Sequence, residues 1–281
     1  MKNLLHILLL SIATLLYSCE GDILPPQQPQ MVVEGWIEDG GHPVVMLTSS
    51  VPISEEETSL DSLGQYLIRW ARVVVSDGEK TVVLSGKYTK DYFPPYIYTS
   101  AAIRGVAGKT YKLTVDYKDY HATATTTVPV SVPLDRIYTE LLNEEDSAYS
   151  VRAVFWHDAT QQRYFKLFTH IWGQPQPYYS AFMGLFDCTL LDNPADVLVN
   201  SGMSIANFGN YTARFHRGDT VSVKLCTMDE ESYRFWYDYA ESENFKSNPF
   251  MPSTSNPVTN VRGALGYWCG YGQSVKTILV K

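Results

Sequence analysis

The sequence predicts an all-β fold of two β-sandwich domains, the first immunoglobulin-like, with one short helix in the second. Short runs that alternate apolar and polar residues recur along the chain, and turn dipeptides such as Asp77-Gly78 separate them. Only one stretch has helical periodicity. Roughly seven short strands in about a hundred residues, with turn signals between them, are typical of an immunoglobulin-like sandwich.

The start of the chain has the pattern of an exported, lipid-anchored protein. Lys2 precedes an apolar run at residues 4–16, and Ser18 stands directly before Cys19. This run is short for a membrane span, which needs about 20 apolar residues. The pattern predicts a signal peptide at 1–18 and a lipidated Cys19 that holds the protein at a membrane surface. A plain secretory peptide with an incidental cysteine is the alternative.

Residues 19–30 are polar and proline-rich, which predicts an extended, lipidated tether between the anchor and the fold. Glu20 and Asp22 follow the anchor cysteine closely. Acidic residues at this place resemble the signal that carries some Bacteroidetes lipoproteins to the cell surface. An ordinary solvated linker is an equal alternative, so the sequence leaves open which side of the membrane the protein faces.

The first sandwich is predicted over residues 31–129. A hairpin is expected across 39–41 (Asp-Gly-Gly), and another across Asp77-Gly78, because these residues tolerate the positive φ of tight turns. The segment 88–98, with two prolines and four tyrosines, suits a loop or an irregular edge. The expected strands are 31–38, 43–49, 72–76, 80–84, 111–116 and 121–128.

The second sandwich is predicted over residues 134–281. Pro129 and Pro133 form the expected joint between the domains, because proline restricts the backbone and interrupts ladder pairing. The segment 173–196 is hard to place. The chain is expected to close with a hairpin across 270–272 (Gly-Tyr-Gly). The other expected strands are 134–142, 149–157, 163–172, 211–217 and 220–227.

One helix is predicted near residues 228–243. Thr227 followed by Glu230 has the spacing of a capping box, and the acidic residues of the first turn favour the positive end of the helix dipole. Apolar residues at i, i+3, i+4 and i+7 are expected to face a sheet. They are Tyr233, Trp236, Tyr237 and Ala240.

Composition excludes several classes of protein. An apolar content of 45% and a charged content of 19% describe a globular chain, and a formal charge of −8 without a basic cluster argues against nucleic acid. No metal-ligand spacing, phosphate loop or G-x-S-x-G frame is present, so we expect no enzyme, metal or cofactor. Cys188, Cys226 and Cys269 allow either one disulfide with a leftover thiol or three buried thiols.

Several blocks of the chain resemble a Bacteroidetes lipoprotein family known only as domain of unknown function 4249. The similar blocks lie at residues 31–40 (MVVEGWIEDG), 44–50, 72–78, 105–113 and, at the end, 256–258 and 270–272. The chain departs from the family at Trp268-Cys269, where a phenylalanine-like and a small residue are expected. The resemblance implies an outer-membrane lipoprotein, often encoded beside a TonB-dependent transporter, with no established catalytic residues.

The expected role is therefore a non-enzymatic accessory of a TonB-dependent uptake system, which docks on the transporter or captures its substrate. A carbohydrate-binding or cell-surface adhesion module that acts without a transporter is the alternative. The expected partners are a membrane through the lipid, the transporter, and a glycan or peptide ligand.

Aromatic residues give the clearest sequence-based pointer to a binding surface. Tyr96 and Tyr98 follow two prolines, and Tyr178 and Tyr179 follow two more. Exposed tyrosines in loops ordered by proline suit a surface that stacks on sugars or anchors a partner. The alternative is that these rings fill the sandwich cores.

Two serines lie in a pattern that resembles an O-glycosylation sequence of exported Bacteroidetes proteins. The pattern, Asp followed by Ser or Thr and an aliphatic residue, occurs at Ser62 and Ser147 in acidic loops. A third occurrence at Thr220 follows an expected turn residue. Ser62 and Ser147 are therefore the better candidates.

Overall fold

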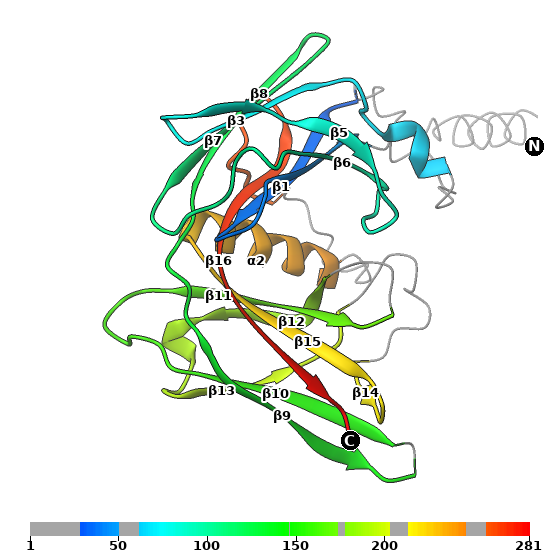
Figure 1. Ribbon diagram of the computed structural model, residues 1–281, viewed down its shortest axis with the longest axis vertical. Helices are drawn as coiled ribbons and strands as arrows, with labels where there is room; N and C mark the ends of the chain where they lie inside the picture. Colours follow the sequence, from blue (N-terminus) through cyan, green and yellow to red (C-terminus); the bar gives the residue numbers. More distant parts are fainter. Residues whose placement is uncertain (1–28, 51–61, 146, 174–177, 203–212, 246–256) are drawn as a thin grey trace, which may run out of the picture.

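The computed structural model describes residues 29–50, 62–145, 147–173, 178–202, 213–245 and 257–281 (Figure 1). This part of the chain is mostly strand and forms three sheets, which confirms the all-β prediction. It contains one α-helix, α2 (Glu230–Phe245), and two short 3-10 turns, η1 (Ser62–Tyr66) and η2 (Cys188–Leu190). The predicted signal peptide, Cys19 and most of the predicted tether lie outside the described residues.

The largest sheet has eight strands and runs through both halves of the molecule. In spatial order its strands are β12 (Tyr179–Asp187), β11 (Tyr164–Ile171), β15 (Thr220–Met228), β16 (Leu265–Leu279), β1 (Met31–Glu38), β2 (Val44–Ser49), β6 (Tyr96–Thr99) and β5 (Ser85–Tyr88). We call it the long sheet.

Two smaller sheets complete the fold. One has the order β4 (Thr81–Val83), β3 (Arg72–Ser76), β7 (Thr110–Tyr117) and β8 (Tyr120–Thr127). The other has β13 (Ala195–Val199), β10 (Ala148–Phe155) and β14 (Phe215–His216), with β9 (Leu134–Asn143) also paired to β10. Each small sheet packs on one half of the long sheet, so two sandwiches share a single sheet.

Strand β16 links the two sandwiches. Its first half runs parallel to β1, with Glu34 opposite Tyr267. Its second half runs antiparallel to β15, with Lys224 opposite Val275. A single strand of fifteen residues therefore serves both sandwiches.

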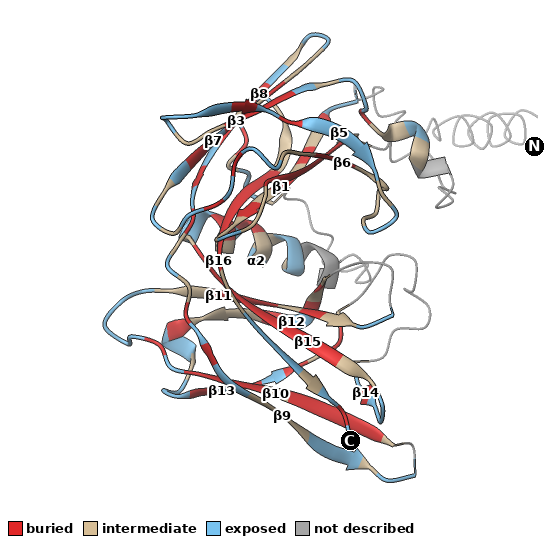
Figure 2. Cartoon of the chain, viewed as in Figure 1, coloured by how far each residue is buried: buried red, intermediate tan, exposed pale blue. Residues whose placement is uncertain are grey.

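Each sandwich has its own apolar core, which appears as buried strand segments in Figure 2. In the first core, Val33 and Trp268 of the long sheet join Val75 and Leu113 of the small sheet. The second core lies between the long sheet and the small sheet that contains β10. Its residues include Leu167, Val223 and Leu225 from the long sheet, and Val151 and Phe155 from β10.

The first core also draws on the end of the chain. Val261 and Trp268 are buried in it, and Trp268 Nε1 donates to the carbonyl of Tyr111 at 3.1 Å. Gly35 makes room for the indole, because a Cβ at that position would lie 2.8 Å from Trp268 Cε3. The division into domains at residues 129 and 134 stays a prediction, but the contents of the first core extend beyond it.

The expected closing hairpin across residues 270–272 is wrong, since β16 is continuous there. Gly270 and Gly272 instead allow another segment of the chain to pass close to β16. A Cβ on Gly270 would lie 2.6 Å from the Thr127 carbonyl oxygen, and one on Gly272 would lie 2.4 Å from that of Pro129. The segment that joins the sandwiches crosses β16 at this point, and only glycine allows so close an approach.

The start of the helix also differs from the prediction. Asp229 is the capping residue, since its Oδ1 accepts a hydrogen bond from the Ser232 N–H at 2.8 Å. Thr227 still belongs to β15, where its hydroxyl accepts from the Val132 N–H. The apolar stripe is rotated as well, because Phe235 is buried and Tyr237 is exposed.

Candidate functional site

The candidate site is the face of the long sheet that points away from both cores. Side chains alternate along a strand, so Lys166 and Phe168 point away from the core that contains Leu167. Helix α2 covers part of this face, and its Phe235 and Trp236 rings lie 4.6 and 5.1 Å from the Tyr267 ring. We call it the α2 face. It comprises Glu34, Trp36, Glu38, Lys166, Phe168, His170, Ser222, Lys224, Cys226, Tyr267, Cys269 and Tyr271, with Tyr92, Trp172 and Tyr178 from adjoining loops.

An ion pair between Lys224 and Glu38 lies near the middle of the α2 face. Lys224 Nζ donates to Glu38 Oε1, and Lys224 is buried while Glu38 is half-buried. Burial alone lowers the pKa of Lys224, but the charge of Glu38 and this hydrogen bond outweigh burial and raise the pKa above its usual range. Lys224 is therefore held in its charged form.

Aromatic rings surround this ion pair. Lys224 Nζ lies 4.3 Å from the ring centroid of Tyr178 and 5.2 Å from that of Phe168. The Tyr92 ring lies 5.9 Å from the Trp36 ring, and the pKa of Tyr92 is raised by burial and by the charge of Glu38. The contacts of Lys224 with Tyr178 and Phe168 are cation–π interactions, which are strongest where water is excluded.

A second lysine on this face has no counter-ion in the part of the chain that the structure describes. Lys166 is buried, and its Nζ lies 3.9 Å from the Trp236 ring centroid and 5.6 Å from that of Phe168. Burial lowers the pKa of Lys166 to about 7, and only Cys226 and Cys269 oppose that shift. Near neutral pH the amine therefore exists in both its charged and its uncharged form.

A half-buried carboxyl group, that of Glu34, occupies the β1 end of the face. Tyr267 donates its hydroxyl to Glu34 Oε1 at 2.8 Å. Burial raises the pKa of Glu34, and this hydrogen bond offsets only part of the shift. Two acids and two lysines thus share one sheet face, although charged groups in a sheet normally face water. Such a concentration of buried and half-buried ionisable groups is typical of functional sites.

The other end of the face is open and aromatic. Trp172, directly after β11, is 65% exposed, and its Nε1 donates to Ser222 Oγ at 3.0 Å. His170 lies between two rings, 6.3 Å from Trp172 and 5.9 Å from Tyr178. The face therefore passes from a covered, charged part beneath α2 to an exposed, aromatic part beyond it.

The four tyrosines predicted as binding residues do not come together. Tyr178 lies on the α2 face, but Tyr179 is buried in the opposite direction. Tyr98 is buried, and its hydroxyl donates to the Ile68 carbonyl at 2.8 Å and accepts from the Ala71 N–H at 3.1 Å. The prediction that Tyr98 and Tyr179 are exposed is wrong.

Tyr96 is half-buried and packs within the first sandwich. Its ring lies 5.5 Å from that of Tyr98 in an edge-to-face arrangement, and its hydroxyl donates to the Arg69 carbonyl at 3.1 Å. Gly86 on the neighbouring strand leaves space for that hydroxyl, because a Cβ there would lie 2.2 Å from it. The structure thus gives Tyr96 a packing role, and Tyr178 alone of the four belongs to the candidate site.

The remaining predicted positions lie elsewhere. Ser62 begins η1, but its side chain is outside the description. Ser147 lies in the turn between β9 and β10, half-buried, with φ of 48°. Cys188, Cys226 and Cys269 are free and buried, which agrees with the alternative of three buried thiols.

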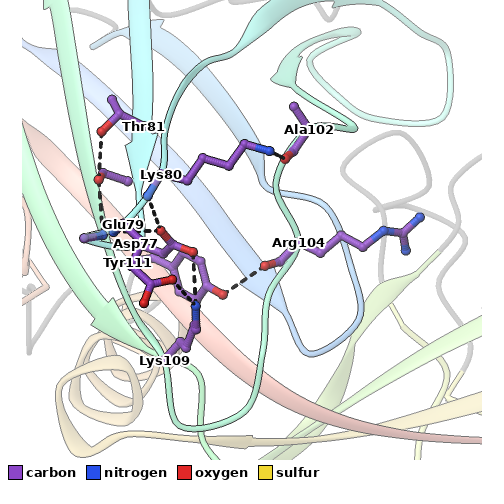
Figure 3. A network of polar contacts seen from close by, with 10 residues as sticks. Asp77, Glu79, Lys80, Thr81, Ala102, Arg104, Lys109 and Tyr111 are labelled. Carbon is purple, nitrogen blue, oxygen red and sulfur yellow. Dashed lines mark hydrogen bonds and ion pairs between the residues drawn. The ribbon is translucent and has the colours of Figure 1, made fainter.

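A polar network on the first sandwich serves the fold (Figure 3). Asp77 Oδ1 accepts from the backbone N–H groups of Glu79 and Lys80 at 3.2 and 2.7 Å, and Gly78 has φ of 89°. Lys109 Nζ lies 3.4 Å from Asp77 and 3.3 Å from Glu79. These contacts stabilise the predicted turn at Asp77-Gly78, at an exposed edge of the molecule.

Sequence reasoning missed the charged residues of the α2 face. Lys166, Lys224 and Glu34 occupy the polar positions of alternating strands, which are normally exposed to solvent. One sequence signal for their burial was available, namely that both lysines stand within long apolar stretches. Lys224, for example, lies in β15, which is otherwise almost entirely buried. Helix α2 covers this second face of the sheet, and the strand pattern alone does not show that.

A comparison with known protein families identifies one match. The family described as Domain of unknown function (DUF4249) matches residues 20–277, which include every strand from β1 to most of β16. A search of the curated proteins finds no match. Within the described ranges no group of His, Cys, Asp and Glu could hold a metal ion, and no helix there has the length and apolarity to cross a membrane.

Proposed function

We propose the following function for this chain, which belongs to the DUF4249 family. It is a non-enzymatic, lipid-anchored outer-membrane protein that acts as an accessory of a TonB-dependent uptake system, either by docking on the transporter or by capturing its substrate. The observation that carries this proposal is the α2 face, where the Lys224–Glu38 pair and the rings of Tyr178 and Trp172 form a polar, aromatic surface. Such surfaces suit recognition.

The chemistry of the α2 face favours binding over catalysis. A cysteine acts as a nucleophile only as the thiolate, which requires a lowered pKa. Burial instead raises the pKa of Cys269 to about 12 and raises that of Cys226 well above its usual range. Lys166 lies against Trp236 beneath α2, which keeps its amine away from a reacting molecule.

The start of the described chain supports an anchored protein that stays close to its membrane. Gln30 is tied to the first sandwich, because its N–H donates to Ser50 Oγ at 2.9 Å. The tether from Cys19 to that point has about 11 residues and reaches at most about 40 Å when fully extended. A lipid on Cys19 would therefore hold the first sandwich nearest the membrane.

The test is to isolate the tagged protein from membranes and identify what accompanies it. The wild type is expected in the outer membrane together with a TonB-dependent transporter. Cys19→Ala should be released in soluble form, because an acyl-free chain has no anchor. Tyr178→Ala should stay in the membrane but lose the partner. Membrane retention of Cys19→Ala, or a wild type that isolates without a transporter, would contradict the proposal.

A second candidate function is a glycan-binding or adhesion module that needs no transporter. One observation favours it, namely the exposed and hydrogen-bonded indole of Trp172. A protein of this kind would bind glycan in purified form and would isolate from membranes without a transporter.

A further inference from the structure

We propose that Trp172, with His170 and Tyr178, forms a stacking site for the pyranose ring of a glycan at the open end of the α2 face. This inference rests on the ligand-binding part of the proposed function, and it adds the class of ligand and the residue that contacts it. The argument begins with the indole ring.

The Trp172 ring is both exposed and fixed. It is 65% exposed, yet its Nε1 donates to Ser222 Oγ at 3.0 Å, and Ser222 is itself held by Thr277 Oγ1 at 2.8 Å. The backbone is held as well, because the Trp172 N–H donates to the Thr220 carbonyl at 3.0 Å. A ring held this way loses little conformational entropy when a ligand covers it.

Two other exposed tryptophans provide a comparison. Trp70 is 88% exposed and Trp156 is 60% exposed, so exposure alone does not distinguish Trp172. Among the described residues, neither of those two indoles has a hydrogen bond that fixes the orientation of the ring, whereas Trp172 has one. The α2 face thus presents a flat apolar surface in one defined orientation.

The surroundings of this ring match the chemistry of a sugar. A pyranose has an apolar C–H face and a rim of hydroxyl groups. The indole can receive the face, and the His170 ring, 6.3 Å from the indole, and the Tyr178 ring, 5.9 Å from His170, carry polar atoms near the rim. The Tyr178 side chain also forms a hydrogen bond with Ser222, the residue that holds the indole. Tyr178 is also backed by the Lys224–Glu38 pair, since Lys224 Nζ lies 4.3 Å from its ring centroid.

The same surroundings are less suited to a protein partner. A stable protein interface buries about 800 Å² on each side and has an apolar centre. Three residues that border the Trp172 indole, directly or through Ser222, are polar, namely His170, Ser222 and Thr277. A small ligand that is apolar on one face and polar at its rim fits this environment better.

The experiment measures sugar binding by the full chain purified in detergent. The probes are maltohexaose, cellohexaose, xylohexaose and mannohexaose. Their binding is measured by titration calorimetry and by quenching of tryptophan fluorescence. At least one probe is expected to bind. Trp172→Ala should weaken that binding about 10-fold or more, which corresponds to about 1.4 kcal/mol. Trp172→Tyr should keep part of the affinity, and Trp70→Ala, the matched exposed control, should bind like the wild type.

Either of two results would overturn the inference. One is that no probe binds with a Kd below about 10 mM, which means a binding free energy weaker than about −2.7 kcal/mol. The other is that Trp172→Ala, shown to be folded by its circular dichroism, binds as tightly as the wild type. If Trp172→Ala instead releases the transporter while no probe binds, Trp172 is a protein contact, and the accessory role stands without the sugar site. If the protein binds a sugar but isolates from membranes without a transporter, the accessory role is wrong and the sugar site stands.

Discussion

Glu38 and Lys224 lie 186 residues apart in the sequence and form an ion pair inside the molecule. Glu38 ends β1, whose inner face belongs to the first sandwich, and Lys224 lies in β15, whose inner face belongs to the second. The pair spans the place where β16 passes from one sandwich to the other. It therefore joins the two halves on the face opposite the cores.

Removal of one partner of this pair should destabilise the protein. Lys224→Met leaves the Glu38 carboxylate partly buried without its cation, which costs about 3–5 kcal/mol in buried pairs. Urea unfolding at pH 7 measures the loss. The double variant with Glu38→Gln should recover much of the stability, because it leaves no isolated charge. As a matched control, Arg234→Ala removes the exposed helix pair with Glu230 and should cost under about 0.5 kcal/mol. If Lys224→Met and Arg234→Ala lost similar amounts of stability, the assignment of Lys224 and Glu38 as a buried ion pair would be contradicted.

Lys166 should make stability depend on pH. Its pKa is lowered to about 7 by burial, whereas an unfolded lysine has a pKa of about 10.4. Between these values the unfolded chain binds the proton more tightly, so the free energy of unfolding rises with pH by at most about 1.4 kcal/mol per unit. Below pH 7 both states carry the proton and the penalty is present in full.

Lys166→Met removes this titration, because methionine fills a similar space without charge. The variant should be more stable than the wild type below pH 7, and the difference should shrink between pH 7 and 10. Urea unfolding at a series of pH values measures it. Lys276→Met, at an exposed position of β16, controls for the loss of a lysine side chain. A difference that is constant across the series would show that Lys166 is not the titrating group.

Tyr98 should behave as a core residue. Tyr98→Ala should cost about 3–5 kcal/mol, as for large buried aromatics. Tyr98→Phe keeps the ring but leaves the Ile68 carbonyl and the Ala71 N–H without their partner, and should cost about 1–3 kcal/mol. Tyr88→Ala, on the exposed strand β5, should change stability by under about 0.5 kcal/mol. Thermal unfolding that ranks the three variants in any other order would contradict this assignment.

The first sandwich should not fold from residues 31–129 alone. That fragment lacks Val261 and Trp268, and Trp268 is one of the largest fully buried side chains of its core. Dispersed NMR spectra should appear only when residues 257–272 are supplied, either through a linker or as a peptide. A well-dispersed spectrum from 31–129 alone would show that the predicted domain boundary is sufficient.

Local patterns were predictable from the sequence. The turn at Asp77-Gly78 and the alternation in β7 and β8 depend on neighbouring residues, and the structure confirms both. The parallel pairing of β1 with β16 depends on residues more than 200 positions apart, so no local pattern indicates it. The same holds for the candidate site. Tyr178 was found because prolines mark its loop, whereas Lys166 was missed because only the position of α2 shows that its side chain is covered.

The shared strand has a consequence for how this protein is made. A chain that is synthesised from its N-terminus provides β1 early and β16, the parallel partner of β1, late. Until residues 265–271 arrive, β1 has an open edge, and the space beside Gly35 lacks the Trp268 indole. The first sandwich is therefore expected to stay incomplete while the strands of the second sandwich are synthesised. Such intermediates expose apolar surface and bind chaperones or aggregate. Final assembly of the first sandwich is thus expected to depend on residues 265–271, which are synthesised long after β1.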